Sequence, residues 1–239
     1  MDSARLNALF DGHATELAPA LLGCELTVST AEGSVRVRLT EVEAYGDQGE
    51  DPGAHSYNGR TARNSSLFGP PRHTYVYLNY GIHRCLNFAC DADGTAGGVL
   101  LRAAEVLEGR DLAVERRGGR DTGAKLLSGP GRLGQGLGIT LPMDATALNI
   151  IDDSGSGLDV EALDPSPARF TLSPPAAALP SEQVSRGPRV GVSGTGGSRR
   201  YLWRYWIEAD ASVSAYRPGK NVPVELGSRE DQQPAGRAS

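Results

Sequence analysis

The sequence contains few of the features that build metal centres, disulfide frameworks or membrane spans. Its three cysteines, Cys24, Cys85 and Cys90, form no CxxC pair, so their spacing predicts neither a disulfide framework nor a structural zinc site. No apolar run approaches the ~18 residues of a membrane span, and the first residues lack the basic and apolar regions of a secretory signal. We therefore expect a protein of the reducing cytoplasm that contacts no membrane, binds no metal and needs no cofactor.

Acidic residues are missing from two long windows, although the chain carries a formal net charge of −5. Residues 54–90 and 183–207 contain no aspartate or glutamate, and all 29 acidic residues lie outside them. The basic residues there are Arg60, Arg63, Arg72, Arg84, His55, His73 and His83 in the first window and Arg186, Arg189, Arg199, Arg200 and Arg204 in the second. This separation favours one basic face on an acidic body, with chance clustering of arginines as the alternative.

Many turns are expected between the regular elements, because the chain has 31 glycines and 15 prolines. Alternating apolar and polar residues predict strands over 24–30 and 34–45, followed by a meander of three strands. The strands of the meander are expected over residues 73–79, 83–90 and 97–104. Short helices are expected over 14–22, 61–67, 110–117 and 132–137, and another is expected to begin at Asp51-Pro52. The predicted fold class is α+β: a single domain with a curved antiparallel β-sheet core, peripheral short helices and long loops.

The C-terminal third gives a weaker pattern. Residues 152–188 are dense in proline, glycine, serine and alanine, with one expected strand over 169–172. Strand character returns over 200–216. We assign residues 1–217 to the domain and residues 218–239, which lack an apolar pattern, to a disordered tail.

Two carboxylates share one face of the strand predicted over 34–45. Strand alternation places Glu41, Glu43 and Tyr45 on the same side. One of the glutamates is a candidate general base, and a solvated edge strand is the plainer interpretation. A third interpretation treats Glu41 and Glu43 as the paired acids of a carbohydrate hydrolase, but no tryptophan lies near them in the sequence.

The tyrosines of the predicted meander form a second candidate site. Tyr75 and Tyr77 share a strand face, and Tyr80 stands at the turn before Gly81. Such residues are core in most proteins, but a tyrosine at a hairpin tip in an acid-free window fits a wedge between base pairs. Tyr77 could stack on a base.

Two further patterns are weak when taken alone. The glycine-rich turn at residues 128–135 leads into a helix and exposes backbone amides that suit a phosphate, but it lacks the GK[ST] of a Walker A loop. His83 and Cys85 share a strand face, which is compatible with a metal only if a second pair of ligands exists.

Taken in order, these segments resemble the alkyladenine (3-methyladenine) DNA glycosylase family, as found in bacteria. The resemblance runs from about residue 15 to residue 217. It departs at Ile82 and His83, beside the hairpin tip, and over residues 152–188. The segments that carry it are EVEAY at 41–45, AHS at 54–56, GRTxRN at 59–64, FGPP at 68–71, YVYxxYG at 75–81 with Cys85 and Asn87, LLRAxE at 100–105, LSGPGRL at 127–133 and PRVGV at 188–192.

The resemblance implies a role for each matching residue. Glu43 would be the general base that holds the attacking water, with Arg102 near the water and the phosphate. Tyr80 would fill the gap left in the duplex. Tyr45, His55 and Tyr77 would stack around the flipped base, Asn87 would discriminate against the exocyclic amino group of guanine, and Arg60, Arg63, Arg132 and Arg189 are expected on the DNA backbone.

The activity so implied is base excision repair of double-stranded DNA containing damaged purines, without a cofactor. Lysine is scarce: the chain has only Lys125 and Lys220, and neither lies in the glutamate or tyrosine segments. A glycosylase that also cleaves the strand attacks the sugar with an amine, so we expect a monofunctional enzyme that leaves an abasic site. We further expect a monomer in the cytoplasm, associated with the nucleoid. A damage-binding protein that flips bases without cutting them is the alternative.

Overall fold

The computed structural model describes residues 1–151, 166–175, 177 and 179–223. The segment 152–165 and the end of the expected tail, 224–239, lie outside the described residues. Within the described part of the chain, no helix has both the length and the apolar character needed to cross a membrane.

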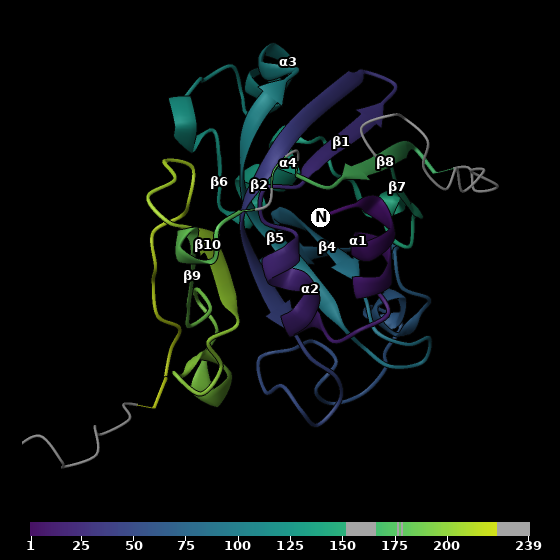
Figure 1. Cartoon of the computed structure of the whole chain (residues 1–239), viewed down its shortest axis with the longest axis vertical. Helices are drawn as coiled ribbons and strands as arrows, with labels where there is room; N and C mark the ends of the chain where they lie inside the picture. The colour runs from purple at the N-terminus through teal and green to yellow at the C-terminus, as the bar shows by residue number, and fades with distance from the viewer. Residues whose placement is uncertain (152–165, 176, 178, 224–239) are drawn as a thin grey trace, which may run out of the picture.

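One curled, ten-stranded sheet organises the part of the chain that the structure describes (Figure 1). The main path of the sheet runs β3-β4-β5-β2-β1-β8-β7, while β10 pairs with β2 and β9, and β6 pairs with β5. The strands are β1 (Glu25–Thr30), β2 (Gly33–Tyr45), β3 (Thr74–Asn79), β4 (His83–Ala89), β5 (Gly98–Glu108), β6 (Leu127–Ser128), β7 (Leu148–Ile150), β8 (Ala168–Ser173), β9 (Val184–Gly187) and β10 (Arg204–Ile207).

The predicted α+β fold with a curved sheet core is confirmed. The meander β3-β4-β5 is antiparallel, as expected, and each named strand pair is antiparallel except β7–β8, which is parallel. β2 is central rather than an edge, because it pairs with β5 along one side and with β1 and then β10 along the other. Register shifts flank Glu41 in the β2–β5 ladder, and such bulges bend a strand and re-aim its side chains.

Four short helices pack against the sheet, and α1 and α2 cover one face of it (Figure 1). The helices are α1 (Ser3–Leu9), α2 (Ala14–Ala20), α3 (Arg110–Arg116) and α4 (Pro130–Gly136). The 3₁₀ turns lie at Ser65–Phe68, Gly123–Lys125, Leu141–Met143, Ser181–Gln183 and Gly194–Gly197. α1 was not predicted from the sequence; Asp2 caps it by accepting a hydrogen bond from the Arg5 amide. The helix expected at Asp51-Pro52 does not form. Asp51 lies in a turn, and its carboxylate is buried in an ion pair.

The core lies between α1, α2 and this face of the sheet (Figure 1). Leu17 and Leu21 pack there against the β2 side chains Val42 and Ala44. Because strand side chains alternate, the neighbouring Glu43 and Tyr45 point to the other face. The helices thus secure the sheet from one side and leave the other side for a functional site.

The described chain stays attached to the body beyond residue 217. The backbone amide of Gly191 donates to the Arg217 carbonyl (2.8 Å), and that of Gly194 donates to the Lys220 carbonyl (2.9 Å). These bonds fix the loop at residues 190–193 against the C-terminal segment, and that loop covers the candidate site.

Candidate active site

A pocket of about 480 Å³ opens on the face of the sheet opposite α2. It lies between strands β2 to β5 and the loop at residues 190–193. Its volume falls within the range of small-molecule sites. The structure brings six predicted site residues to its lining: Tyr45, His55, Tyr77, Tyr80, Asn87 and Arg102.

Glu43 lies directly behind the lining of this pocket, against the lining residues Tyr45, Arg102 and Val190, and its side chain is fully buried. One carboxylate oxygen, Oε1, accepts a hydrogen bond from the Val190 amide (2.7 Å) and lies 3.3 Å from Nη1 of Arg102. The other, Oε2, accepts from the Tyr45 hydroxyl (2.8 Å). A carboxylate has about four acceptor positions, so three partners leave capacity for one more donor, such as water.

Tyr45 keeps its proton in this setting. Burial and the adjacent Glu43 carboxylate raise the pKa of Tyr45 well above its usual value of 10.0. The phenol is therefore a permanent donor to Glu43, and its ring remains part of the pocket lining.

Aromatic rings form the other wall. His55 packs edge-on against Tyr77, with 4.5 Å between ring centroids and 84° between planes. Tyr75 stacks on Tyr77 at 5.4 Å and shares a 2.9 Å hydrogen bond with Nδ1 of His55. Tyr75 was not among the predicted site residues, although its position on the same strand face as Tyr77 was the signal that could have included it.

His55 is held in the neutral form near pH 7. Burial, assisted by the nearby Arg63 guanidinium, lowers the pKa of His55 below its usual 6.5. A neutral imidazole in the wall adds no charge that would repel a cationic ligand.

Asn87 is positioned by the meander. It faces Tyr75 across the β3–β4 ladder and Leu100 across the β4–β5 ladder. Its buried side-chain amide donates to the Tyr75 carbonyl (3.0 Å), which fixes the side chain at the pocket lining. Its expected role in excluding guanine stays a prediction.

Arg102 connects the pocket to a second buried carboxylate. Its Nε donates to Glu41 Oε1 (2.8 Å), while Nη2 donates to the Ser214 hydroxyl (3.2 Å). Burial alone would lower the pKa of Arg102, but the nearby carboxylates of Glu43 and Glu41 outweigh it and raise the pKa above its usual value. Arg102 therefore stays charged beside Glu43.

The interpretation of Glu41 as part of a solvated edge strand is wrong. β2 is a central strand here, and the Glu41 side chain has no exposed surface. Glu41 also differs from a hydrolase acid, because its oxygens accept from Arg102, Arg204 and Ser214, and of these partners only Arg102 lines the pocket.

Tyr80 stands at the tip of the β3–β4 hairpin, at the pocket mouth. It is 84% exposed, and Ile82 beside it is 68% exposed. Tyr80 and Gly81 have positive φ, 49° and 71°, and the Ile82 amide donates to the Asn79 carbonyl (3.1 Å), which closes a tight turn within the three-residue loop between the paired residues Asn79 and His83. The backbone of a bulky residue with positive φ is strained, and such strain is typical of functional sites.

α4 supports this hairpin from behind. Gly134 lies so close to the β4 backbone that an added Cβ would come within 2.0 Å of the Arg84 carbonyl oxygen. The glycines of the expected phosphate turn thus serve helix packing against β4.

Three of the four arginines expected on the DNA backbone are exposed: Arg60, Arg63 and Arg132. Arg63 lies 5.9 Å from the centroid of the Tyr77 ring and donates to the Leu78 carbonyl (3.1 Å). It therefore also supports the aromatic wall.

The prediction that Arg189 contacts the DNA backbone is wrong, because its side chain is fully buried. The guanidinium forms a two-pronged ion pair with Asp51, with 2.6 Å between Nη2 and Oδ1. It also donates to the carbonyls of Ala44 (3.0 Å) and Gly196 (2.8 Å). Arg189 thereby anchors the loop whose next residue, Val190, donates to Glu43.

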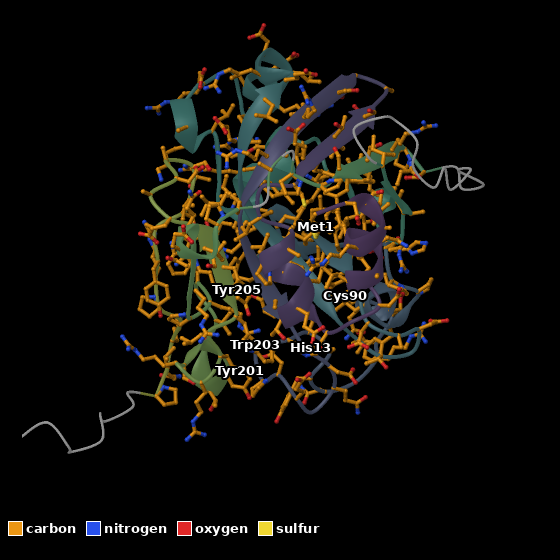
Figure 2. All side chains as sticks on the ribbon, viewed as in Figure 1. Met1, His13, Cys90, Tyr201, Trp203 and Tyr205 are labelled. Carbon is orange, nitrogen blue, oxygen red and sulfur yellow. The ribbon has the colours of Figure 1, made fainter. Side chains whose placement is uncertain are left out.

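Aromatic rings enclose the Arg189 guanidinium. It lies 4.5 Å from the ring centroid of Tyr45, 5.3 Å from that of Trp203 and 5.6 Å from that of Tyr201. Figure 2 shows Tyr201 and Trp203 beside His13, which packs edge-on against Trp203. The second acid-free window therefore supplies part of the interior as well as surface charge.

Two other window arginines also pair with carboxylates of the chain. Arg72 is partly exposed and pairs with the exposed Asp11, whereas Arg204 is buried with Glu41, so the windows contribute less free positive charge than the sequence indicated. Across the described ranges, no group of three or more histidine, cysteine or acidic side chains is arranged to hold a metal ion.

Comparison with known proteins agrees with this geometry. Residues 8–211 match the family model of methylpurine-DNA glycosylase. A relative from Streptomyces avermitilis is 45% identical over 202 residues, covering 84% of this chain and 86% of the relative. A relative from Corynebacterium jeikeium is 42% identical over 226 residues, covering 95% of this chain and 98% of the relative. One from Nocardia farcinica is 44% identical over 211 residues, covering 86% of this chain and 88% of the relative.

All three relatives carry the provisional name 3-methyladenine DNA glycosylase. The resemblance drawn from the sequence is thereby confirmed. Because the family model spans most of the chain and these identities exceed 40%, the chain belongs to the methylpurine-DNA glycosylase family and is a DNA glycosylase, a hydrolase of N-glycosyl bonds.

Proposed function

We propose that this enzyme is a monofunctional glycosylase of base excision repair that removes alkylated or deaminated purines from double-stranded DNA. The observation that carries the proposal is the buried Glu43 carboxylate directly behind the lining of an aromatic pocket, where three lining residues hold it and one acceptor position is left for water. Candidate substrates are 3-methyladenine, 7-methylguanine, hypoxanthine and ethenoadenine.

For a purine that alkylation has made cationic, the reaction needs one base and no other group. A neutral purine such as hypoxanthine must also take up a proton, which solvent water supplies, as it leaves. Glu43 accepts a proton from a water molecule as the water oxygen forms a bond to C1′ of the deoxyribose. The C1′–N bond breaks, and its electron pair leaves with the purine. Alkylation at N3 or N7 makes the purine cationic and therefore a good leaving group, which is why a single carboxylate suffices.

Selectivity arises from the pocket walls. The rings of Tyr45 and Tyr77 favour a cationic base by about 0.5–2 kcal/mol per contact. A base must first leave the duplex, and this costs least at damaged pairs. Tyr80, exposed at the hairpin tip, fills the space that the base vacates.

The expected product is an abasic site without strand cleavage. Strand cleavage of this kind uses an amine that attacks the sugar. Neither Lys125, which donates to the Val213 carbonyl, nor Lys220 lines the pocket. Trapping a protein–DNA adduct with borohydride would contradict this part of the proposal.

DNA binding is assigned to the surface around the pocket. Arg60, Arg63 and Arg132 contact phosphates, and Asn87 rejects the exocyclic amino group of guanine. We propose that the enzyme works as a monomer on nucleoid DNA in the cytoplasm, with residues 1–217 as its core domain.

The test is base release from duplexes that each carry one of the four lesions, measured with enzyme in excess over DNA. The wild type should release at least one of them and leave an alkali-labile site, whereas Glu43→Gln should bind the same duplex without releasing the base. Tight binding with no release by the wild type would instead identify a damage-binding protein.

A further inference from the structure

Glu41 is a buried carboxylate that the proposed reaction does not use. Its Oε1 accepts from Nε of Arg102 (2.8 Å), Nε of Arg204 (2.7 Å) and the Ser214 hydroxyl (2.9 Å), and Oε2 accepts from the Ser214 amide (2.7 Å). Three donors saturate Oε1 and one more holds Oε2, so both oxygens of the carboxylate are fixed by the protein. Among its hydrogen-bond partners only Arg102 lines the pocket, and we assign Glu41 no contact with substrate or water.

Three adjacent strands bring this cluster together. Arg102 comes from β5, Glu41 and Glu43 from β2, and Arg204 from β10, where it faces Glu43 in the ladder. The bulges on either side of Glu41 re-aim its side chain. A buried cluster of two carboxylates and two guanidinium groups results, with no net charge among these four side chains.

The Arg102 guanidinium is planar, so fixing two of its nitrogens fixes the third. Glu41 holds Nε and Ser214 holds Nη2, which leaves Nη1 at 3.3 Å from Glu43 Oε1. Glu43 also accepts from Tyr45 and the Val190 amide. The position of the cation beside the proposed base is thus set by a residue that does not line the pocket.

We infer that Glu41 is a positioning residue that holds Arg102 beside Glu43 and, with Arg204, balances the charge around it. The inference rests on the proposed role of Glu43 as the general base. It assigns Glu41 no contact with the DNA or the water.

The other groups that act on Glu43 are few in the described part of the chain. Tyr77 from β3 and Cys85 from β4 are neutral and kept so by burial, which raises the pKa of each. Arg189, from the covering loop, is a cation whose charge Asp51 balances. Arg102 and its partners therefore dominate the local charge.

Removing one charge at a time gives opposite expectations. Glu41→Gln leaves excess positive charge, so Glu43 stays ionised to lower pH and the acid limb of the rate profile moves down. Arg204→Gln leaves excess negative charge, so the acid limb moves up. If the substitutions only reduced stability, the acid limbs of both rate profiles would move in the same direction or stay in place.

The experiment measures the single-turnover rate of base release from a hypoxanthine duplex between pH 4.5 and 8, normalised to folded enzyme. We expect the acid limb to move by about 0.5 pH unit or more, downward in Glu41→Gln and upward in Arg204→Gln. The rate of base release in Glu41→Gln should also be lower by roughly 10- to 100-fold. Glu41→Asp keeps the charge but shortens the side chain, so it should keep the wild-type limb at a reduced rate. The matched control is Glu25→Gln, in which β1 loses a carboxylate that pairs with Arg36 of β2.

A second readout does not depend on activity. The Nε–H signal of Arg102 in nitrogen-15 NMR, assigned by its loss in Arg102→Lys, should be sharp in the wild type and in Glu25→Gln. It should broaden or vanish in Glu41→Gln, or in Glu41→Asp if the former does not fold. If the wild type releases no base, the proposed function fails, while this signal still decides the positioning role. An unchanged signal, or limbs that move together, would overturn the inference.

Discussion

His55 illustrates how one residue can serve both the pocket and the pH response of the enzyme. Its ring contacts Tyr77 and its Nδ1 contacts the Tyr75 hydroxyl, while burial keeps it neutral. The sequence placed His55 in the pocket only through the family pattern. A histidine four residues after Asp51 has no local signal that distinguishes a pocket wall from a surface loop.

The protonation of His55 predicts a loss of stability in acid. Its pKa in the folded protein lies below 6.5, so the unfolded chain takes up a proton first as the pH falls through 6.5. The free energy of unfolding should therefore decrease below that pH, and His55→Gln should lose this part of the decrease. Urea unfolding between pH 7.5 and 5 measures this pH dependence of the free energy of unfolding. The control is His83→Gln, because His83 is exposed. Identical pH dependence in wild type and His55→Gln would contradict the assignment.

The β3–β4 hairpin is the element that the sequence predicted best. Alternation, the Tyr80-Gly81 turn and the return strand are all local signals, and the structure has them within one residue of the expected bounds. β9 and β10 were harder. Both strands have four residues, and β10 owes its place to pairing with β2, more than 150 residues earlier in the chain. Local patterns carry no information on such pairing, and the same holds for the central position of β2.

The strained turn predicts a conflict between stability and activity. Tyr80 occupies a left-handed conformation that costs a bulky residue of the order of 1 kcal/mol, whereas asparagine tolerates it. Tyr80→Asn should unfold with the same or a higher free energy, by up to about 1 kcal/mol, yet release base from duplex DNA at least roughly 10-fold more slowly.

Thermal unfolding and single-turnover assays on one preparation test both halves of this prediction. Leu141→Asn, which removes an exposed apolar side chain outside the pocket lining, is the control. Full activity in Tyr80→Asn would show that the exposed ring is not used as a wedge.

At the scale of the whole molecule, the buried Asp51–Arg189 pair connects the turn after β2 to the loop that covers the pocket. The sequence could not assign it. Arg189 lies in the same acid-free window as exposed arginines, and its partner is 138 residues away in the chain. The window therefore predicted positive charge correctly but not its location. By contrast, the pocket residues belong to short motifs in which residue type and spacing identify the family.

Breaking this pair should destabilise the whole protein. Arg189→Met leaves the Asp51 carboxylate buried without its cation, with only the Gly46 and Gly53 amides as donors, at a cost of about 3–5 kcal/mol. Adding Asp51→Asn should recover part of the loss, because it removes the unpaired charge. Chemical denaturation of both variants measures the effect. Arg132→Gln, at an exposed site, should change the free energy of unfolding by less than about 0.5 kcal/mol. Equal small effects at both sites would contradict the buried role of Arg189.

The central claim is that Glu43 activates the water that releases the purine. The most direct measurement is single-turnover base release from a hypoxanthine duplex by wild type and Glu43→Gln, each at a concentration that saturates binding to that duplex. We predict equal binding and a rate lower by about 10²- to 10⁴-fold in the variant, which is the usual contribution of a positioned general base. An undiminished rate in Glu43→Gln would contradict the account.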